Sequence, residues 1–249
     1  MATQTPTLHY IFDPLCGWCY GAAPLVDAAR AVAGLTVVAH GGGMMTGSNR
    51  QPVTDALRRY VMPHDERIAG MTGQVFGKDY FDGLLRDAGA VFDSEPPTTA
   101  ILAADALAGR GLDLLKRLQH AHYVQGLRIA DPDVLKTLAR EIGLDGDGFD
   151  AAYAAATGAD TAAHIAASRQ LLTQVGGTGF PTLALEHKGV HTLLEPSRYL
   201  GRPAQWQASL SERIQGYAPW RHQGHQPSSM SPSRCNARCI AGRLPSRST

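Results

Sequence analysis

Residues 13–21 are Asp-Pro-Leu-Cys-Gly-Trp-Cys-Tyr-Gly, and they hold two cysteines, Cys16 and Cys19, two residues apart. The pair lies where a strand pattern gives way to a helix pattern, so Cys16 is expected at a helix N-terminus. Free backbone N–H groups and the helix dipole favour a thiolate at that position. Cys19, one turn later, is expected to be more buried and close enough to form a disulfide with Cys16. The stretch therefore predicts thiol–disulfide exchange, in which one thiolate attacks and the second resolves the mixed disulfide.

The flanks of this motif predict a βαβ unit. Residues 7–13 are short, aromatic and β-branched, which is typical of a strand, and Pro14 stops the pattern. Apolar residues then recur at helical spacing over 16–33, with Gly34 placed to end the helix. Residues 35–40 form a second apolar strand pattern. Strand, helix and strand in this order predict parallel strands joined by a right-handed crossover.

The middle of the chain is predicted to be helical, with no strand between about residue 50 and residue 174. Asp131-Pro132 is a strong helix start, because an N-cap acid precedes a first-turn proline, and Gly143 is a suitable stop. The expected helices are 52–61, 98–108, 112–125, 132–142, 151–156 and 161–174.

Strand character returns near the C-terminus. Residues 182–186 and 190–194 have strand patterns, and Lys188-Gly189 between them suits a tight hairpin turn. Residues 203–215 then form a helix pattern that ends at Gly216. The chain is therefore expected to be an α/β fold whose two halves lie at the ends of the sequence, with an all-helical domain inserted between them. The predicted boundaries are 1–45, 46–174 and 175–220, followed by a disordered basic tail over 221–249.

Composition and charge narrow the function classes. A net charge of +1 argues against a dedicated nucleic-acid binder. Residues 221–249 contain five arginines and no acidic residue, which leaves 18 basic and 22 acidic residues in the rest of the chain. A basic arm for nucleic acid is the less favoured interpretation of this tail, and a solvated extension is the simpler one.

No apolar run is long enough to span a membrane, and Arg30 is the first Lys or Arg, so a cytoplasmic protein without a secretory signal is expected.

Other uses of the cysteine pair are less well supported by the sequence. A structural zinc site would need two more ligands, and Cys235 and Cys239 are separated by three residues in the predicted tail. A structural disulfide fits poorly with a cytoplasmic protein. Two inert buried cysteines are not expected at a strand-to-helix turn. No metal and no cofactor is therefore expected, although Cys235 and Cys239 could serve as a second exchange pair.

The glycine-rich run 176–179 leads into Phe180-Pro181-Thr182, and with the Cys16/Cys19 motif it resembles the thioredoxin fold. The helical insertion makes the chain similar to the DsbA-like family of thiol–disulfide oxidoreductases. Residues 13–21 and the stretch 126–135, Gly-Leu-Arg-Ile-Ala-Asp-Pro-Asp-Val-Leu, resemble the cytoplasmic FrnE-type branch. The resemblance covers about residues 7 to 215. It implies protein thiols and disulfides or glutathione as partners, and it also allows a homodimer.

The resemblance assigns roles to individual residues. It implies that Cys16 is the nucleophile, that Cys19 resolves the mixed disulfide, and that Pro181 is the family's cis-proline beside the pair. Phe180 would then offer its backbone to a substrate segment by strand addition, beside Thr182.

The residues around the two cysteines are expected to tune their redox poise. Gly17 and Trp18 lie between them, and an intermediate redox potential is expected because the indole adds no charge. Trp18 would also cover the rim of the substrate site. Asp13 either caps the first turn of the helix or accepts a proton from Cys19.

Two other functions remain open. Kappa-class glutathione transferases and related isomerases share the inserted-helix architecture, but they typically have serine where Cys16 stands. A non-catalytic peptide-binding or chaperone module would not need both Cys16 and Cys19. Whether the predicted enzyme acts as oxidase, reductase or isomerase depends on redox potential and partner rather than on fold.

Overall fold

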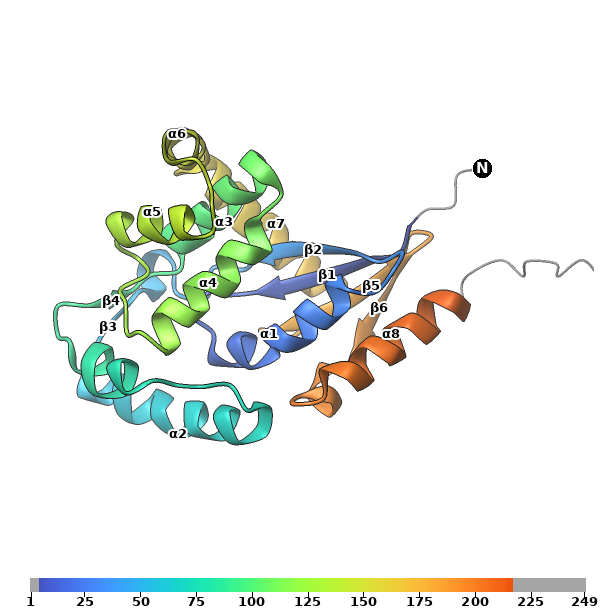
Figure 1. The fold of residues 1–249 in the computed structure, drawn as a ribbon, viewed down its shortest axis with the longest axis horizontal. Helices are drawn as coiled ribbons and strands as arrows, with labels where there is room; N and C mark the ends of the chain where they lie inside the picture. The colour runs from blue at the N-terminus through green and yellow to red at the C-terminus, as the bar shows by residue number, and fades with distance from the viewer. Residues whose placement is uncertain (1–4, 217–249) are drawn as a thin grey trace, which may run out of the picture. The chain divides into compact units, whose positions relative to one another are not determined.

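A four-stranded mixed sheet organises the computed structural model, which describes residues 5–216 (Figure 1). The strand order is β2-β1-β5-β6, with bounds β1 (Thr7–Phe12), β2 (Thr36–Gly41), β5 (Thr182–His187) and β6 (Val190–Leu194). As predicted, β1 and β2 run parallel, while β5 is antiparallel to both β1 and β6. The predicted hairpin turn is confirmed: Lys188 and Gly189 have φ of 54° and 76°, the left-handed backbone of a primed turn.

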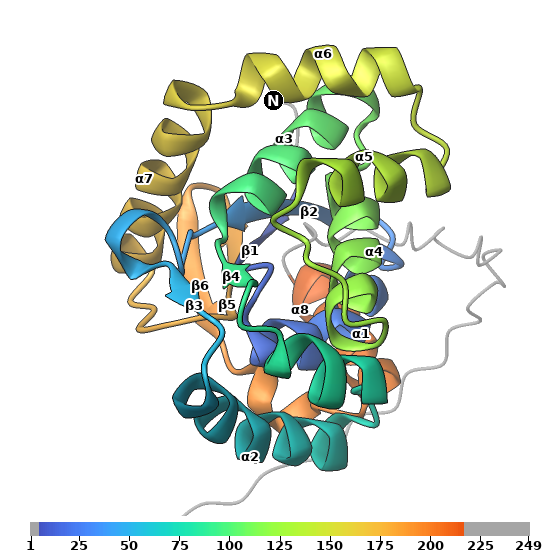
Figure 2. The same cartoon turned by 90° about the vertical axis from the view of Figure 1, so that its left-hand side faces the viewer.

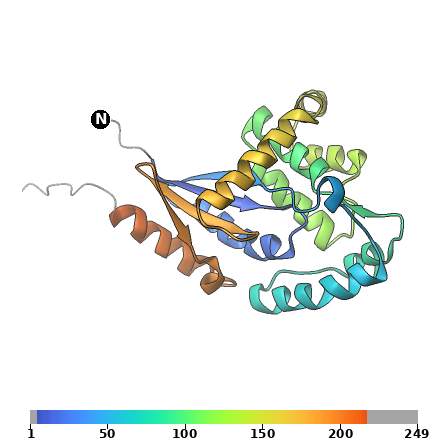
Figure 3. The same ribbon diagram turned by 180° about the vertical axis from the view of Figure 1, so that it is seen from behind.

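Helices cover both faces of the sheet. They are α1 (Gly17–Arg30), α7 (Ala159–Gln174) and α8 (Pro203–Gly216). Successive strand residues point to opposite faces, so Leu8, Tyr10 and Phe12 of β1 are buried in one cluster with residues of α1 and α8. Ile11 points the other way and packs with Val175, just beyond α7. Figure 3 shows α7 crossing the back of the sheet, away from α1 and α8.

The segment between β2 and β5 is mostly helical, as predicted, and Figure 2 shows α2 at the opposite end of the view from α3, α5 and α6. It contains α2 (Asp55–Thr72), α3 (Glu95–Ala108), α4 (Gly111–Tyr123), α5 (Pro132–Glu141), α6 (Gly146–Ala156) and α7. The predicted start of α5 is confirmed, with Asp131 as N-cap and Pro132 in the first turn. Leu114 and Leu118 of α4 belong to the same apolar cluster as β1. The sheet and the helical segment therefore share one core.

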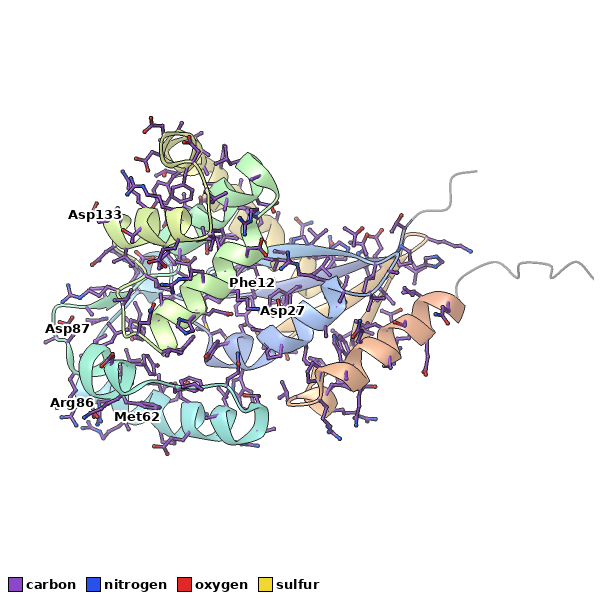
Figure 4. All side chains as sticks on the ribbon, viewed as in Figure 1. Phe12, Asp27, Met62, Arg86, Asp87 and Asp133 are labelled. Atoms are coloured by element: carbon purple, nitrogen blue, oxygen red, sulfur yellow. The ribbon has the colours of Figure 1, made fainter. Side chains whose placement is uncertain are left out.

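Ion pairs add to these contacts between the sheet layer and the helical segment. Figure 4 labels Asp27, which points from α1 toward α4. Its Oδ2 lies 2.6 Å from Nζ of Lys116 on α4. Both side chains are substantially exposed, so the pair contributes little to the stability of the fold.

Two expectations for the helical segment are wrong. Two short antiparallel strands, β3 (Gln51–Pro52) and β4 (Val91–Phe92), lie where no strand was predicted. The helix expected over 52–61 is α2, which begins at Asp55 because Thr54 accepts a hydrogen bond from the Leu57 amide at 3.1 Å. It continues through Pro63, and a π-helical turn η2 (Asp79–Gly83) and a 3₁₀ turn η3 (Leu84–Arg86) follow it unpredicted.

None of the helices within residues 5–216 is both long and apolar enough to cross a bilayer. The predicted basic tail 221–249, with Cys235 and Cys239, lies outside the described residues.

Candidate active site

Cys16 and Cys19 stand at the start of α1, where the sequence places them. Cys16 is the N-cap residue, with an extended backbone at φ −89° and ψ 113°. Its carbonyl accepts the Cys19 amide at 2.9 Å, so Cys19 lies on the first turn. Both residues are free thiols. Cys16 retains 7% of its surface and Cys19 none, so the outer thiol is the one nearer to solvent.

The Phe180 backbone faces the outer thiol. The Sγ atom of Cys16 donates to the Phe180 carbonyl at 3.5 Å. The Phe180–Pro181 peptide bond is cis, as the resemblance implies. Thr182 starts β5 beside it, and its Oγ1 donates to the Gly179 carbonyl at 2.7 Å. The pairing of β1 with β5 thus brings together two motifs that are far apart in the sequence.

The inner thiol lies in an electrostatically unfavourable place for a charge. Burial raises the pKa of the Cys19 thiol well above its ordinary value, and the hydrogen bond and charge of Cys16 act in the same direction. A hydrogen bond with the Asp13 backbone lowers the pKa of this thiol and the Asp13 charge raises it, both by less than burial does. Cys19 is therefore a protonated thiol in the reduced protein.

Asp13 is fully buried and ties three segments together. Oδ1 accepts from the Leu15 amide and from Ser94 Oγ, each at 2.9 Å, and Oδ2 accepts from the Met44 amide. Burial raises the pKa of this carboxyl, while these hydrogen bonds lower it. The expectation that Asp13 caps α1 is wrong, because Cys16 is the N-cap and Leu15 precedes the helix.

A second buried acid, Asp65 of α2, lies against the residues between the two thiols. A Cβ placed on Gly17 would be 2.6 Å from Asp65 Oδ1, and the Tyr80 hydroxyl donates to Asp65 Oδ2 at 2.9 Å. Burial raises the pKa of the Asp65 carboxyl to about 7, and the hydrogen bond from Tyr80 lowers it. Burial raises the pKa of the Tyr123 hydroxyl well above its ordinary value, and the charges of Tyr80, Asp65, Cys16 and Cys19 raise it further. Asp65 and the two thiols therefore border the same buried region of low dielectric constant, around the Tyr123 hydroxyl.

A pocket of about 460 Å³ adjoins the site. Its lining includes Pro181, which the resemblance implies to be catalytic, and Trp18, Phe180 and Thr182, which are expected to bind substrate. Arg67 of α2 also lines it, and its guanidinium carbon lies 5.9 Å from the centre of the Trp18 ring, within cation–π range. The pocket has the volume of an ordinary small-molecule site.

Sequence reasoning missed Asp65, Arg67, Ser94 and the glycine that faces Phe180. A Cβ on Gly42 would lie 2.2 Å from ring atoms of Phe180. The run Gly41-Gly-Gly43 is the one signal for such a close approach, because only glycine leaves the space. Nothing in the sequence near Asp65 marks it, since its neighbourhood arises from the packing of α2 on α1.

Comparisons with known proteins agree with this geometry. The family model described as a DSBA-like thioredoxin domain matches residues 7–198. The chain is similar to the cytosolic disulfide reductase DsbM from Pseudomonas aeruginosa, with 58% identity, a TM-score of 0.80, and coverage of 84% of this chain and 98% of that one. The structure of the same reductase with GSH gives 56% identity, a TM-score of 0.79, and coverage of 84% and 99%.

A more distant solved structure is a candidate protein disulfide isomerase from Nitrosomonas europaea. It is 26% identical with a TM-score of 0.71, and the match covers 86% of this chain and 100% of that one. No curated protein sequence matches the chain.

The fold is a thioredoxin-like sheet with a helical insertion, and its paired thiols lie beside a cis-proline. The family match spans well over half of the sequence. The chain belongs to the DSBA-like thioredoxin family of thiol–disulfide oxidoreductases.

Proposed function

We propose that this protein is a cytoplasmic disulfide reductase that takes its electrons from glutathione. The observation that carries the proposal is the pairing of a nearly buried outer thiol, Cys16, with a fully buried protonated thiol, Cys19, on one helical turn. Similarity to a cytosolic disulfide reductase, at 58% identity, supports reduction as the direction of the reaction and the cytoplasm as its location.

In the proposed reaction the Cys16 thiolate attacks one sulfur of a substrate disulfide. A mixed disulfide forms, and the other substrate sulfur leaves as a thiolate that takes a proton. Cys19 then attacks Cys16 Sγ, which releases the second substrate thiol and leaves a Cys16–Cys19 disulfide. Two glutathione molecules return the pair to dithiol and leave as one glutathione disulfide, so the electrons balance.

The surroundings of the pair supply the other proposed roles. Phe180 offers its backbone to a substrate segment by strand addition, next to Pro181. Trp18 and Thr182 shape the adjoining pocket. Gly17 and Asp13 tune the redox potential. Asp13 acts on the Cys19 thiol in two directions, because a hydrogen bond with its backbone lowers the pKa of that thiol and its charge raises it.

The pocket beside Pro181 is proposed as the glutathione site. Arg67 and Glu195 are the charged side chains among its described lining residues. Glutathione carries carboxylates and an amino group, so a cation and an anion on the lining suit it. The similarity to a reductase structure that contains GSH supports this assignment.

The test is insulin reduction with glutathione, using the full chain. We expect Cys16→Ser to abolish turnover, and Cys19→Ser to accumulate a mixed disulfide that mass spectrometry identifies. Equilibration with glutathione buffers, with and without residues 221–249, should give a potential nearer about −270 mV than about −200 mV. Full activity of Cys16→Ser would overturn the redox mechanism, and a potential above about −200 mV would overturn the reductase direction.

The same experiments separate the other functions. Conjugation of an electrophile to glutathione that survives in Cys16→Ser would indicate a kappa-class-like transferase. Suppression of aggregation that persists in the Cys16→Ser/Cys19→Ser variant would indicate a peptide-binding module. Sedimentation equilibrium tests whether the chain forms the homodimer that the resemblance allows.

A further inference from the structure

Two histidines and one glutamate gather on three neighbouring strands, on the sheet face opposite Tyr10. Glu186 of β5 pairs directly with His191 of β6 and, on its other side, with Thr7 of β1. His9 stands two residues after Thr7, and residues two apart on a strand share a face. The register therefore places the side chains of His9, Glu186 and His191 on the same side of the sheet.

The nitrogen and oxygen atoms of this cluster are spaced like the ligands of one metal ion. His9 Nε2 lies 2.9 Å from Glu186 Oε2, and His191 Nε2 lies 3.7 Å from the same oxygen. One ligand atom from each residue lies within 4.8 Å of the others. Ligands at about 2.1 Å from an ion are about 3.0 Å apart in octahedral geometry and about 3.4 Å apart in tetrahedral geometry. Small side-chain rotations would thus bring all three onto one ion.

The cluster is anchored at one end and open to solvent at the other. The His9 side chain is 13% exposed, whereas Glu186 and His191 are 35% and 33% exposed. An ion could therefore reach the site from solvent while His9 holds a fixed position. Three protein ligands leave at least one coordination position for water.

His40 of β2 completes the arrangement around His9. Its Nε2 lies 2.9 Å from His9 Nδ1. A histidine that binds a metal through one ring nitrogen usually donates its other N–H to an acceptor nearby. Neutral His9 can bind through Nε2 and keep its proton on Nδ1, directed at His40 Nε2. The chain therefore supplies both the ligands and the group that would orient the central one.

We propose that His9, Glu186 and His191 bind a divalent transition-metal ion, with His40 as a positioning residue. Two imidazoles and one carboxylate suit Zn²⁺ and its neighbours in the first transition row better than Mg²⁺ or Ca²⁺. The ion would link β1, β5 and β6, so it would stabilise the edge hairpin of the sheet. This site is separate from the thiol pair and independent of the proposed function.

Zinc titration calorimetry on the full chain tests this site, with all four cysteines changed to serine so that no thiolate competes for the ion. We expect one Zn²⁺ per chain, with affinity at least about tenfold weaker in His191→Ala and in Glu186→Gln, and about tenfold weaker in His40→Ala. At the same Zn²⁺ concentration, the ion should also raise the Tm of the parent by more than that of His191→Ala. His191 is partly exposed, so its loss should leave the fold intact, which circular dichroism checks.

His187→Ala is the matched control, because His187 neighbours Glu186 on β5 and points to the opposite face. It should bind Zn²⁺ as the parent does. Equal Zn²⁺ affinity in the parent, His191→Ala and Glu186→Gln would place the ion elsewhere and overturn the proposal. Absence of binding in the parent would overturn it as well.

Discussion

Asp65 Oδ1 lies 2.6 Å from the point where a side chain on Gly17 would begin. Gly21 stands one turn later on the same face of α1, and a Cβ there would be 2.7 Å from Cγ2 of Ile68. These two glycines let α2 lie directly against the start of α1. The close packing of α2 is thus a reason for glycine at position 17, in addition to the redox role proposed for this residue.

Gly17→Ala should destabilise the protein. The new methyl group would have to displace the Asp65 carboxylate, which the Tyr80 hydroxyl holds, and such overpacking costs about 1–3 kcal/mol in the free energy of unfolding. Urea unfolding of the reduced protein measures the change. Gly70→Ala is the matched control on α2, because nothing lies within 4 Å of a Cβ there. Equal stability of the two variants would contradict the packing argument.

Asp65→Asn should change how stability depends on pH. Folded Asp65 keeps its proton up to about pH 7, whereas the unfolded carboxyl loses it near 3.8. Its contribution to stability is therefore fully present below about pH 4 and is lost as pH rises toward 7, by about 1.4 kcal/mol per pH unit. Asparagine cannot ionise, so the unfolding free energy of the variant should rise relative to that of the parent from about pH 4 to 7, and the difference should then level off.

Urea unfolding of both proteins at several pH values measures that difference. Burial lowers the pKa of His40 to about 4 and that of His122 to about 3. The stability that each neutral imidazole contributes to the folded protein is therefore lost as pH falls. They are common to both proteins and cancel in the comparison. Parallel stability curves for the variant and the parent would show that Asp65 is ionised throughout the range.

Gly42→Ala should impair protein substrates by pushing the Phe180 ring aside. The methyl group would lie 2.2 Å from Cε1 and Cζ of that ring, and the Phe180 carbonyl is the partner of the Cys16 thiol. A small displacement at a reacting centre can reduce kcat/KM by about tenfold to a hundredfold. Stopped-flow reduction of a disulfide-bonded peptide measures this.

A double-mutant cycle tests the cause of that loss. Phe180→Ala removes the ring, so adding Gly42→Ala to it should cost little more. If the two losses are additive, the effect of Gly42→Ala does not pass through Phe180.

Arg67→Ala should weaken the binding of glutathione more than it slows disulfide exchange. Loss of a charged hydrogen bond costs about 1.5–3 kcal/mol, which raises KM for glutathione by at least about tenfold while kcat changes less. Steady-state kinetics with dithiothreitol, which has no carboxylate, should show no such increase. Arg59→Ala, on the same helix, is the control for a general charge effect. An equal rise of KM with both reductants would exclude recognition of glutathione by Arg67.

The sequence predicted those parts of the site that depend on local pattern. Strand and helix periodicity located β1 and α1, and the cysteine spacing located the thiols between them. The start of α2 was misplaced because Pro52 resembles a first-turn residue, whereas Thr54 is the cap that forms. The end of α2 was misplaced because a proline usually stops a helix, yet α2 continues past Pro63.

The remaining parts depend on contacts between distant segments. Asp13 has three hydrogen-bond partners, two of which lie far along the chain, so its nearest neighbours in sequence suggested a cap instead. The Glu186–His191 pair follows from the hairpin register, but the approach of His9 requires the pairing of β1 with β5. No local pattern carries that information.

The closeness of α1 and α2 at Gly17 has a consequence for how relatives of this chain can diverge. A larger residue between the two cysteines requires a smaller or displaced residue opposite it on α2. Positions 17 and 65 should therefore change together across the family, and a redesign of the dipeptide between the cysteines should alter both positions at once.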